Sequence, residues 1–592
     1  MNPKAARAET MAQAIRETAI EHGTITAVQS AEGDVSYTWA ELVSEMDQFA
    51  GGLSALGVER GKTVALMMGN RPEFHIADMA VVTAGGTPFS VYQTYTPAQI
   101  SYLLEDAQAE TAIVSSEYLE VFKEAGAQVD CLRTIVTVDG ETGDGLQPWE
   151  TVKGLNPAFD GKAAAAAVRP DDVLTLIYTS GTTGPPKGVE LTHANLIPVV
   201  RAVAELVHLE PGDRLISWLP AAHIAERDAH HYIPIVYAAS ITCCPDPRQI
   251  IQFLPAVRPN WFFAVPRIWE KLKAGLEAML DSQSAEQAAP IKQALADSIL
   301  AVQLKQAGED VPADLATRVA EADATYFAGL RAMLGLDNVR TVGVGAAPTP
   351  PAVIEFFHAI GIELAELWGM SETCGFGTLN PMGAVRIGTV GPPSPGAEII
   401  LADDGEVLIR GACVMKGYRN KPEATAEAID SEGWLHTGDI GSFDEAGYLK
   451  IIDRKKEIII NAAGKNMSPA NIEAAIKTSS PLIGQACVIG DARPYNTALL
   501  VLDSEFAPVW AQKRGIASTD LESLSADLQM IEAIEAAVKE GNSHLARVEQ
   551  IKRFKILPTD WLPGGDELTP TMKLKRKPIA EKYAAEIEEL YS

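Results

Sequence analysis

In the first part of the chain, segments with helical apolar spacing alternate with short apolar runs. The helical segments are residues 38–56, 74–84 and 97–107. The runs TVALMM (63–68) and TAIV (111–114) predict buried strands between them. This alternation predicts an α/β fold with a largely parallel sheet that carries helices on both faces.

The pattern changes further along the chain. Residues 163–167 are five alanines and predict a surface linker, whereas residues 274–336 are rich in Ala, Gln and Glu and predict an inserted helical hairpin. After Val390, short strands separated by Gly and Asp turns are typical of a small β unit. From about Arg454 onward, short strands mix with acidic helices, which predicts a second, α+β unit.

The charge balance narrows the function classes. Of the 592 residues, 49 are Lys or Arg and 78 are Asp or Glu, so the formal net charge is −29. This excludes a protein that coats nucleic acid, which needs a basic surface, but it allows one nucleotide as ligand. Six cysteines without a C-x-x-C pair favour a reducing compartment. Because neither a signal-peptide core nor an apolar run of membrane-span length is present, we expect a cytoplasmic protein, with peripheral contact at the inner membrane face left open.

The most informative segment is VLTLIYTSGTTGPPKGV, residues 173–189, in which a strand pattern leads into a loop rich in glycine and hydroxyl residues. The loop residues that predict phosphate binding are Thr179, Ser180, Gly181, Thr182, Thr183, Gly184 and Lys187. Glycines let backbone N–H groups approach an anion, hydroxyls add donors, and the lysine adds a charge. The loop does not match G-x-x-x-x-G-K-[ST], since Gly188 follows the lysine, so it is a different kind of phosphate loop.

This loop resembles the signature of the AMP-forming acyl-CoA synthetases, members of the adenylate-forming (ANL) superfamily. Further segments match motifs of that family in the same order along the chain. They are WLPAAHIAER with His223, GAAP (345–348), WGMSE (368–372), WLHTGD (434–439), DRKKE (453–457) and LTPTMKLKRK (568–577). Together the matches extend over nearly the whole chain.

The resemblance implies a fold class and a domain division. Residues 1–453 would form a large N-terminal domain of layered α/β subdomains with a β-barrel-like unit, which binds AMP and the acyl group. Residues 454–592 would form a small, mobile α+β lid domain that turns about a hinge at Lys456. The lid would first present a lysine for adenylation and then rotate to admit CoA.

The resemblance also implies roles at the nucleotide. The loop from Thr179 to Lys187 would contact the β- and γ-phosphates of ATP, and Glu372 would hold Mg²⁺, a hard cation that prefers carboxylates. The residues that would line adenine and ribose are Gly345, Ala346, Ala347, Trp368, Gly369, Asp439 and Arg454. Trp368 and Ser371 depart from the usual Tyr-Gly-x-Thr-Glu, but they keep an aromatic ring and a hydroxyl.

Three residues are matched to the reaction itself. Ser371 would donate to the α-phosphate, His223 would lie beside the substrate carboxylate, and Lys573 would bridge the acid and the α-phosphate oxygens. The basic run that follows, residues 575–577, leaves the register of the lysine open. Many relatives have a lysine near Ile460, where this chain has none, which leaves the details of the thiolation conformation open.

The substrate class rests on the segment RPNWFFAVPRIWEKL, residues 258–272, and the helical insertion after it. Both resemble the long-chain fatty acyl-CoA synthetase branch, which implies a fatty acid, ATP and CoA as substrates. The segment's aromatic residues either line an acyl tunnel or pack in the core. They are Trp261, Phe262, Phe263 and Trp269. The alternatives are a ligase for another carboxylic acid, an acyl-AMP ligase that loads a carrier protein, and, more distantly, a non-catalytic nucleotide-binding protein; the oligomeric state is not predicted.

Overall fold

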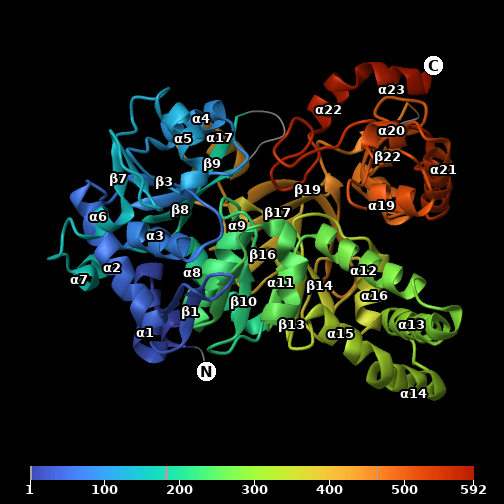
Figure 1. The fold of residues 1–592 in the computed structure, drawn as a ribbon, viewed down its shortest axis with the longest axis horizontal. Helices are drawn as coiled ribbons and strands as arrows, with labels where there is room; N and C mark the ends of the chain where they lie inside the picture. The colour runs from blue at the N-terminus through green and yellow to red at the C-terminus, as the bar shows by residue number, and fades with distance from the viewer. Residues whose placement is uncertain (1–2, 180–184, 463–464) are drawn as a thin grey trace.

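The structure is a computed structural model that describes residues 3–179, 185–462 and 465–592 (Figure 1). Its largest sheet has eight strands. In sheet order they are β18 (Gly417–Tyr418), β9 (Lys187–Thr192), β8 (Val173–Thr179), β4 (Thr87–Ser90), β3 (Thr63–Met67), β5 (Thr111–Val114), β6 (Thr134–Thr137) and β7 (Leu146–Pro148). From β8 to β7 the strands pair in parallel, whereas β9 and β18 are antiparallel. The predicted, largely parallel sheet is therefore confirmed.

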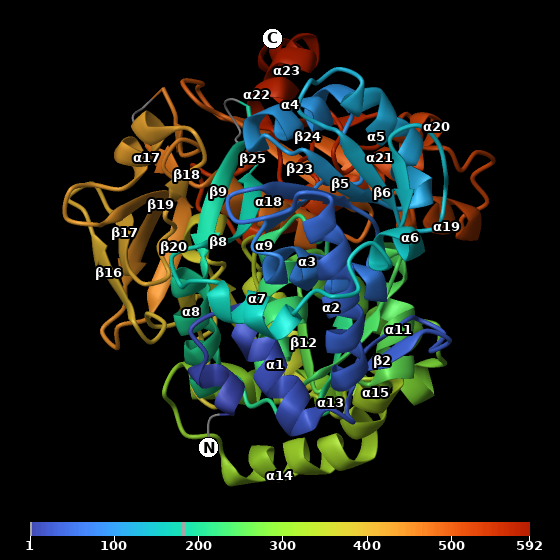
Figure 2. The same ribbon diagram turned by 90° about the vertical axis from the view of Figure 1, so that its left-hand side faces the viewer.

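Helices cover both faces of this sheet (Figure 2). Val64 and Leu66 of β3 belong to one hydrophobic cluster with α2 (Trp39–Ala55) and α3 (Pro72–Thr83). The alternate residues Ala65 and Met67 point to the other face and pack in a second cluster with further helices. These are α4 (Pro97–Ala107) and α5 (Leu119–Gly126).

Two smaller, four-stranded sheets continue the N-terminal part. One contains β10 (Arg214–Ser217), β11 (Ser240–Cys243), β1 (Thr26–Gln29) and β2 (Ser36–Thr38), and the other contains β12 (Trp261–Ala264), β13 (Thr341–Val344), β14 (Leu364–Trp368) and β15 (Thr378–Leu379). The principal helices around them are α1 (Met11–His22), α8 (His193–Leu206), α9 (Ile224–Arg227), α10 (Ile233–Tyr237), α11 (Ile250–Val257) and α16 (Pro351–Ala359). Between α9 and α10, the stretch η3 (Asp228–Tyr232) is a π-helix.

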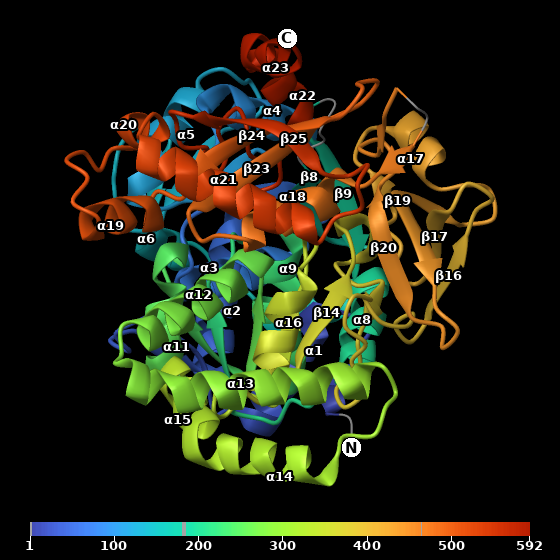
Figure 3. The ribbon, with the colours of Figure 1, turned by 90° about the vertical axis from the view of Figure 1, so that its right-hand side faces the viewer.

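The expected small β unit is an antiparallel sheet of β16 (Ala397–Leu401), β17 (Glu406–Gly411), β19 (Leu435–Phe443) and β20 (Leu449–Arg454), with α17 (Pro422–Ala428) beside it. The chain then enters an α+β unit with the sheet β23 (Ile483–Ile489), β24 (Asn496–Leu502) and β25 (Ile551–Leu557). Its other elements are β21 (Ile459–Ile460), β22 (Asn466–Met467), α18 (Pro469–Thr478), α19 (Phe506–Lys513), α20 (Leu521–Ser525), α21 (Leu528–Ser543), α22 (Arg576–Lys582) and α23 (Ala584–Tyr591). This unit has hydrophobic clusters of its own, and it lies over α12 (Pro266–Asp281) and α13 (Ala285–Gln306) (Figure 3).

Two expectations are corrected. The five alanines do not form a linker but the helix α7 (Gly161–Ala167), because Asp160 caps it and Ala165 is buried. The region expected to be one helical hairpin contains four α-helices, α12 (Pro266–Asp281), α13 (Ala285–Gln306), α14 (Ala313–Ala322) and α15 (Ala328–Leu334). The Ser284 side chain caps α13, and Gly335 ends α15 with a positive φ of 72°, so local signals divide the segment.

Within the described residues, no helix is both long and apolar enough to cross a lipid bilayer.

Candidate nucleotide and acid site

The phosphate loop connects β8 and β9, which pair antiparallel with Thr179 opposite Lys187. Ser180, Gly181, Thr182, Thr183 and Gly184 lie outside the described residues. The ammonium group of Lys187 lies 4.3 Å from the centre of the Tyr418 ring, a cation–π contact. The two ends of the loop are thus fixed by the large sheet.

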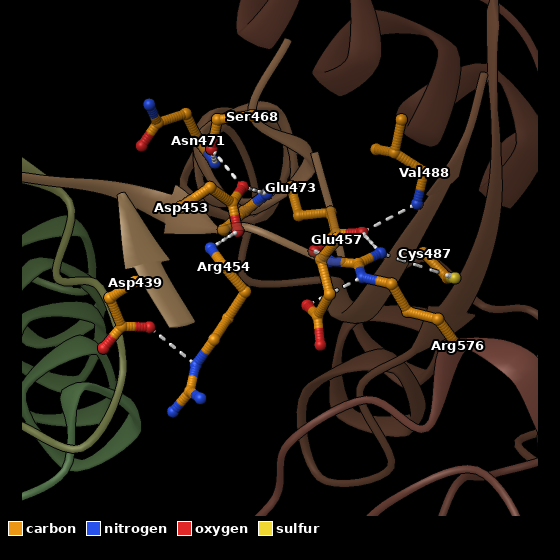
Figure 4. A network of polar contacts seen from close by, with 11 residues as sticks. Asp439, Asp453, Arg454, Glu457, Ser468, Asn471, Glu473, Cys487, Val488 and Arg576 are labelled. Carbon is orange, nitrogen blue, oxygen red and sulfur yellow. Dashed lines mark hydrogen bonds and ion pairs between the residues drawn. The ribbon is translucent and has the colours of Figure 1, made fainter. Parts of the chain in front are cut away.

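Two of the predicted adenine and ribose residues, Trp368 and Arg454, contact Asp439. Trp368, at the end of β14, donates from Nε1 to Asp439 Oδ2 at 2.8 Å, and Arg454 Nε lies 2.8 Å from Oδ1. Asp439 and Arg454 are also direct partners across β19 and β20 (Figure 4). Asp439 is buried while Arg454 is exposed, so the carboxylate has a fixed orientation and the arginine can reach a ligand. We call Lys187, Trp368, Glu372, Tyr418, Asp439 and Arg454 the nucleotide cluster.

Glu372, the predicted metal ligand, lies in the short 3₁₀ helix η6 (Ser371–Thr373) and is 8% exposed. Its Oε1 accepts a hydrogen bond of 2.8 Å from the Tyr418 hydroxyl. Tyr418 was not predicted; it joins the cluster because β18 pairs with β9, with Tyr418 opposite Val189. In the sequence, Tyr418 stands in the segment MKGY, which is close to none of the matched motifs, so nothing marked this tyrosine as part of the site.

Close backbone packing shapes the predicted adenine side. A Cβ atom on Gly369 would lie 2.0 Å from the carbonyl oxygen of Gly375, so glycine is required there. The predicted turn at Gly345, Ala346 and Ala347 directly follows β13, and Ala346 has a positive φ of 69°. A left-handed alanine is uncommon and marks a constrained turn.

His223 begins α9 and caps it, since its Nδ1 accepts from the backbone N–H of Ala225 at 3.1 Å. In the neutral ring, Nε2 therefore carries the proton and can act as a donor. Burial, together with the smaller effect of the positive charge of Lys573, lowers the pKa of His223 to about 4. His223 is thus a neutral hydrogen-bond donor near pH 7.

A buried polar network, which the sequence did not reveal, holds α9 in place. Arg227 pairs with Asp78 and also donates to Tyr232 at 2.9 Å and Ser90 at 3.0 Å. The side chains of Arg227 and Asp78 are completely buried. Each charge is compensated by the other and by the surrounding hydrogen bonds. The network therefore fixes the helix that carries His223.

Lys573 lies in a tight turn of the C-terminal part: its N–H donates to Thr569 Oγ1 at 3.0 Å, and its carbonyl accepts from the Thr569 N–H. The residue keeps solvent-accessible surface. Desolvation by the surrounding protein and the charge of Arg454 lower the pKa of Lys573, while Asp439 and Glu372 oppose this shift. The lysine therefore interacts with charges of the nucleotide cluster.

The neighbouring cations have other partners. Lys575 Nζ donates to the Gly565 carbonyl at 2.8 Å, and Lys577 lies 3.9 Å from Glu581. Arg576 binds both carboxylate oxygens of Glu473 at 2.6 and 2.8 Å (Figure 4). Lys573, in contrast, is acted on by the charges of Arg454, Asp439 and Glu372 in the cluster.

The predicted hinge residue, Lys456, is exposed in the turn that follows β20. Residues on both sides of the turn are held by hydrogen bonds and ion pairs (Figure 4). Before it, Asp453 accepts from the Ser468 hydroxyl and Lys455 bonds Glu406 at 2.9 Å; after it, Glu457 lies 3.1 Å from Arg576. Ser371 begins η6 beside Glu372 and is partly exposed.

The aromatic residues after position 258 pack in the core rather than around an open tunnel. Trp261, Phe262, Phe263 and Trp269 are each at most 4% exposed. Trp269 contacts Phe357 edge to face, with ring centres 4.9 Å apart. An apolar pocket lies instead beside Phe376, next to the Glu372 loop, and its other lining residues come mainly from α8 and from the turns at residues 394–397 and 412–413.

Comparison with known proteins gives two family matches. Residues 15–419 match the model described as "AMP-binding enzyme", and residues 456–592 match "AMP-binding enzyme C-terminal domain". The putative fatty-acid–CoA ligase fadD11 of Mycobacterium tuberculosis is 50% identical over 438 residues, which cover 73% of this chain and 76% of that protein. The long-chain-fatty-acid–CoA ligase FadD15 of Mycobacterium bovis is 36% identical over 568 residues, covering 94% and 92%.

The fold resembles solved structures as well. The anthranilate CoA ligase AuaEII, crystallised with anthranoyl-AMP, superposes with a TM-score of 0.75 at 19% identity, covering 97% of this chain and 98% of that one.

Proposed function

The chain belongs to the AMP-binding enzyme family, and on this basis we propose that it is an ATP-dependent ligase that joins long-chain fatty acids to CoA. The single observation that carries the proposal is the geometry of the nucleotide cluster, in which Asp439 accepts from Trp368 and pairs with Arg454 while the buried Glu372 accepts from Tyr418. The cluster supplies groups for a nucleotide, and the lysine adds a cation where an acid would meet it. The ligase names of the relatives support a long-chain acid as substrate.

The proposed reaction has two steps. First, a carboxylate oxygen attacks the α-phosphorus of ATP and the bond to pyrophosphate breaks, giving acyl-AMP. Then the thiolate of CoA attacks the acyl carbonyl carbon, and the C–O bond to AMP breaks. Because negative charge shifts between oxygen atoms in the first step and develops on the carbonyl oxygen and the leaving AMP in the second, positioning and charge stabilisation contribute most of the catalysis.

We assign the reacting acid to His223, Ser371 and Lys573. Neutral His223 donates from Nε2 to a carboxylate oxygen without protonating it, which leaves the acid nucleophilic. Lys573 stabilises negative charge as it moves between the carboxylate and the α-phosphate, and the Ser371 hydroxyl donates to that phosphate. The support is that Lys573 acts electrostatically on His223 as well as on the cluster.

We assign the base and the ribose to Gly345, Ala346, Ala347, Trp368, Gly369, Asp439 and Arg454, and the phosphates to the loop from Thr179 to Lys187. Asp439 already accepts from Trp368, so it is oriented before a ribose arrives. Glu372 would hold Mg²⁺, and one carboxylate suffices because this ion is usually bound by one or two carboxylates together with substrate phosphates. Bound there, Mg²⁺ would neutralise phosphate charge.

We further propose that residues 1–453 and 454–592 are the two domains and that the second turns about Lys456. The separate hydrophobic clusters of the C-terminal part and the exposure of Lys456 support this division. A cytoplasmic location agrees with the six cysteines, all of which are free thiols, and peripheral contact with the membrane would supply the fatty acid.

ATP–pyrophosphate exchange with acids from acetate to oleate tests the proposed function. We expect a clear optimum among long-chain acids, and formation of acyl-CoA when CoA is added. An optimum for acetate, benzoates or amino acids would contradict the substrate class. Transfer to an acyl carrier protein but not to CoA would instead identify an acyl-AMP ligase.

A further inference from the structure

Two ion pairs join helix α12 of the N-terminal part to the segment between β24 and α19 of the C-terminal part. Arg267 pairs with Asp503 through Nη2. One helical turn later, Lys271 Nζ lies 2.9 and 2.8 Å from the two carboxylate oxygens of Glu505. Figures 1 and 3 show α12 and α19 next to each other. We call these four residues the latch.

The α12 side of the latch is rigid. The helix begins with Pro266, separated by one residue from the end of β12, and the proline fixes its first turn. Trp269 is fully buried between Phe262 and Phe357, with ring centres at 5.6 and 4.9 Å. Arg267 and Lys271 are four residues apart and therefore lie on one face of the helix. Their charges are presented from a fixed support.

The latch can also open without leaving a buried charge unpaired. The Oδ1 atom of Asp503 accepts from the N–H groups of Glu505 and Phe506 at 3.0 and 2.9 Å, and these bonds belong to its own segment. Arg267 also has Glu270 on its own helix, at 3.2 Å. Separating a buried ion pair is costly when one of the charges loses all its partners. Here Asp503 and Arg267 each keep a partner within their own segment.

We propose that Arg267 and Lys271 are positioning residues that hold the C-terminal part in the orientation in which Lys573 reaches the nucleotide cluster. This inference rests on the proposed two-step reaction. Adenylation needs Lys573 at the cluster, whereas transfer of a finished acyl-AMP to CoA does not. Weakening the latch therefore slows the first step selectively.

The Lys271–Glu505 pair allows a charge-swap test, since Glu505 is 65% exposed and its side chain can be replaced with little effect on packing. In Lys271→Glu, ATP–pyrophosphate exchange should fall about fivefold to tenfold, because an attraction becomes a repulsion. CoA transfer from supplied acyl-AMP should change less than about twofold. The double variant Lys271→Glu/Glu505→Lys should recover most of the exchange rate.

The matched control is Lys273→Glu. Lys273 lies on the same helix, but it pairs with Glu277 at 2.7 Å and lies over the Phe356 ring, both in the N-terminal part. The same charge change there should leave the ratio of the two half-reactions unaltered. Arg267→Gln is a second test of the latch and should lower exchange selectively too.

Equal losses in both half-reactions, unchanged exchange in Lys271→Glu, or failure of the double variant to recover would each overturn the latch. These outcomes are separate from failure of the proposed function. If the wild-type protein shows no exchange with any acid, both the function and the latch are overturned.

Discussion

The two halves of the candidate site hold their charged groups in different ways. In the N-terminal part, Asp439 and Glu372 are buried and accept hydrogen bonds from Trp368 and Tyr418. In the C-terminal part, Lys573 is fixed through its backbone in a turn and keeps accessible surface. The first arrangement suits a binding site that is formed before ATP arrives. The second suits a cation that arrives and leaves with a moving domain.

The largest effect should follow removal of that cation. Lys573→Ala should lower ATP–pyrophosphate exchange about 10²- to 10³-fold, because a group that stabilises developing charge is lost. ATP binding and CoA transfer from supplied acyl-AMP should persist, since the nucleotide cluster is intact. Lys577→Ala is the control: this side chain faces Glu581 of its own helix and should be dispensable. Unchanged exchange in Lys573→Ala would contradict the division between the two halves.

A change in the N-terminal part of the site should instead affect the binding of ATP. Asp439→Asn can still accept from Trp368 but loses the charge attraction to Arg454, so KM for ATP should rise about tenfold with a smaller change in kcat. Asp444→Asn tests the same chemical change in the turn after β19, where Asp444 pairs with Arg386 at 2.8 Å. Steady-state kinetics at saturating acid and CoA give both constants. A large fall in kcat with KM unchanged would argue against the assigned role of Asp439.

Tyr418→Phe should have a smaller effect. It removes the hydrogen bond to Glu372 but keeps the ring beneath Lys187, and one such bond to a carboxylate is worth about 1.5–3 kcal/mol at most. We expect the Mg²⁺ concentration for half-maximal activity to rise about threefold to tenfold. Tyr448→Phe is the control, since the Tyr448 hydroxyl bonds the Ala384 carbonyl outside the cluster. An identical Mg²⁺ dependence in both variants would show that Tyr418 does not orient Glu372.

The smallest predicted effect concerns pH. Because the pKa of His223 is lowered to about 4, below that of an unfolded histidine, the folded state favours the neutral ring. The contribution of His223 to the free energy of unfolding is therefore fully present above about pH 6.5 and is lost as the pH falls toward 4. The melting temperature should therefore drop less between about pH 7 and pH 5 in His223→Gln than in the wild type. An equal drop in both proteins would contradict a depressed pKa.

The sequence was informative where signals are local. The helix Pro97–Ala107 was predicted with its bounds from its helical apolar spacing and the proline in its first turn, and the structure adds a capping box formed by Thr96 and Gln99. The alanine run at residues 163–167 was misassigned, since its composition alone did not reveal the Asp160 cap or the burial of Ala165.

The same limit applies to the site. Motif residues could be named from their segments, but Tyr418 reaches Glu372 only through strand pairing with β9, which lies more than 200 residues earlier. The Arg227–Asp78 pair joins residues 149 positions apart, and no local pattern encodes that contact. Long-range pairing of this kind depends on the whole fold, so the support behind His223 was missed.

The most direct test of the claim that the reaction passes through acyl-AMP is to follow the oxygen atoms of the acid into the products. Oleate labelled with ¹⁸O in its carboxylate is incubated with the protein, ATP and CoA, and the products are analysed by mass spectrometry. Attack of the carboxylate on the α-phosphorus, followed by thiol transfer, predicts AMP with one ¹⁸O atom, oleoyl-CoA that keeps the other ¹⁸O in its carbonyl group, and unlabelled pyrophosphate. Label in inorganic phosphate, with ADP as the other product, would contradict an acyl-AMP intermediate.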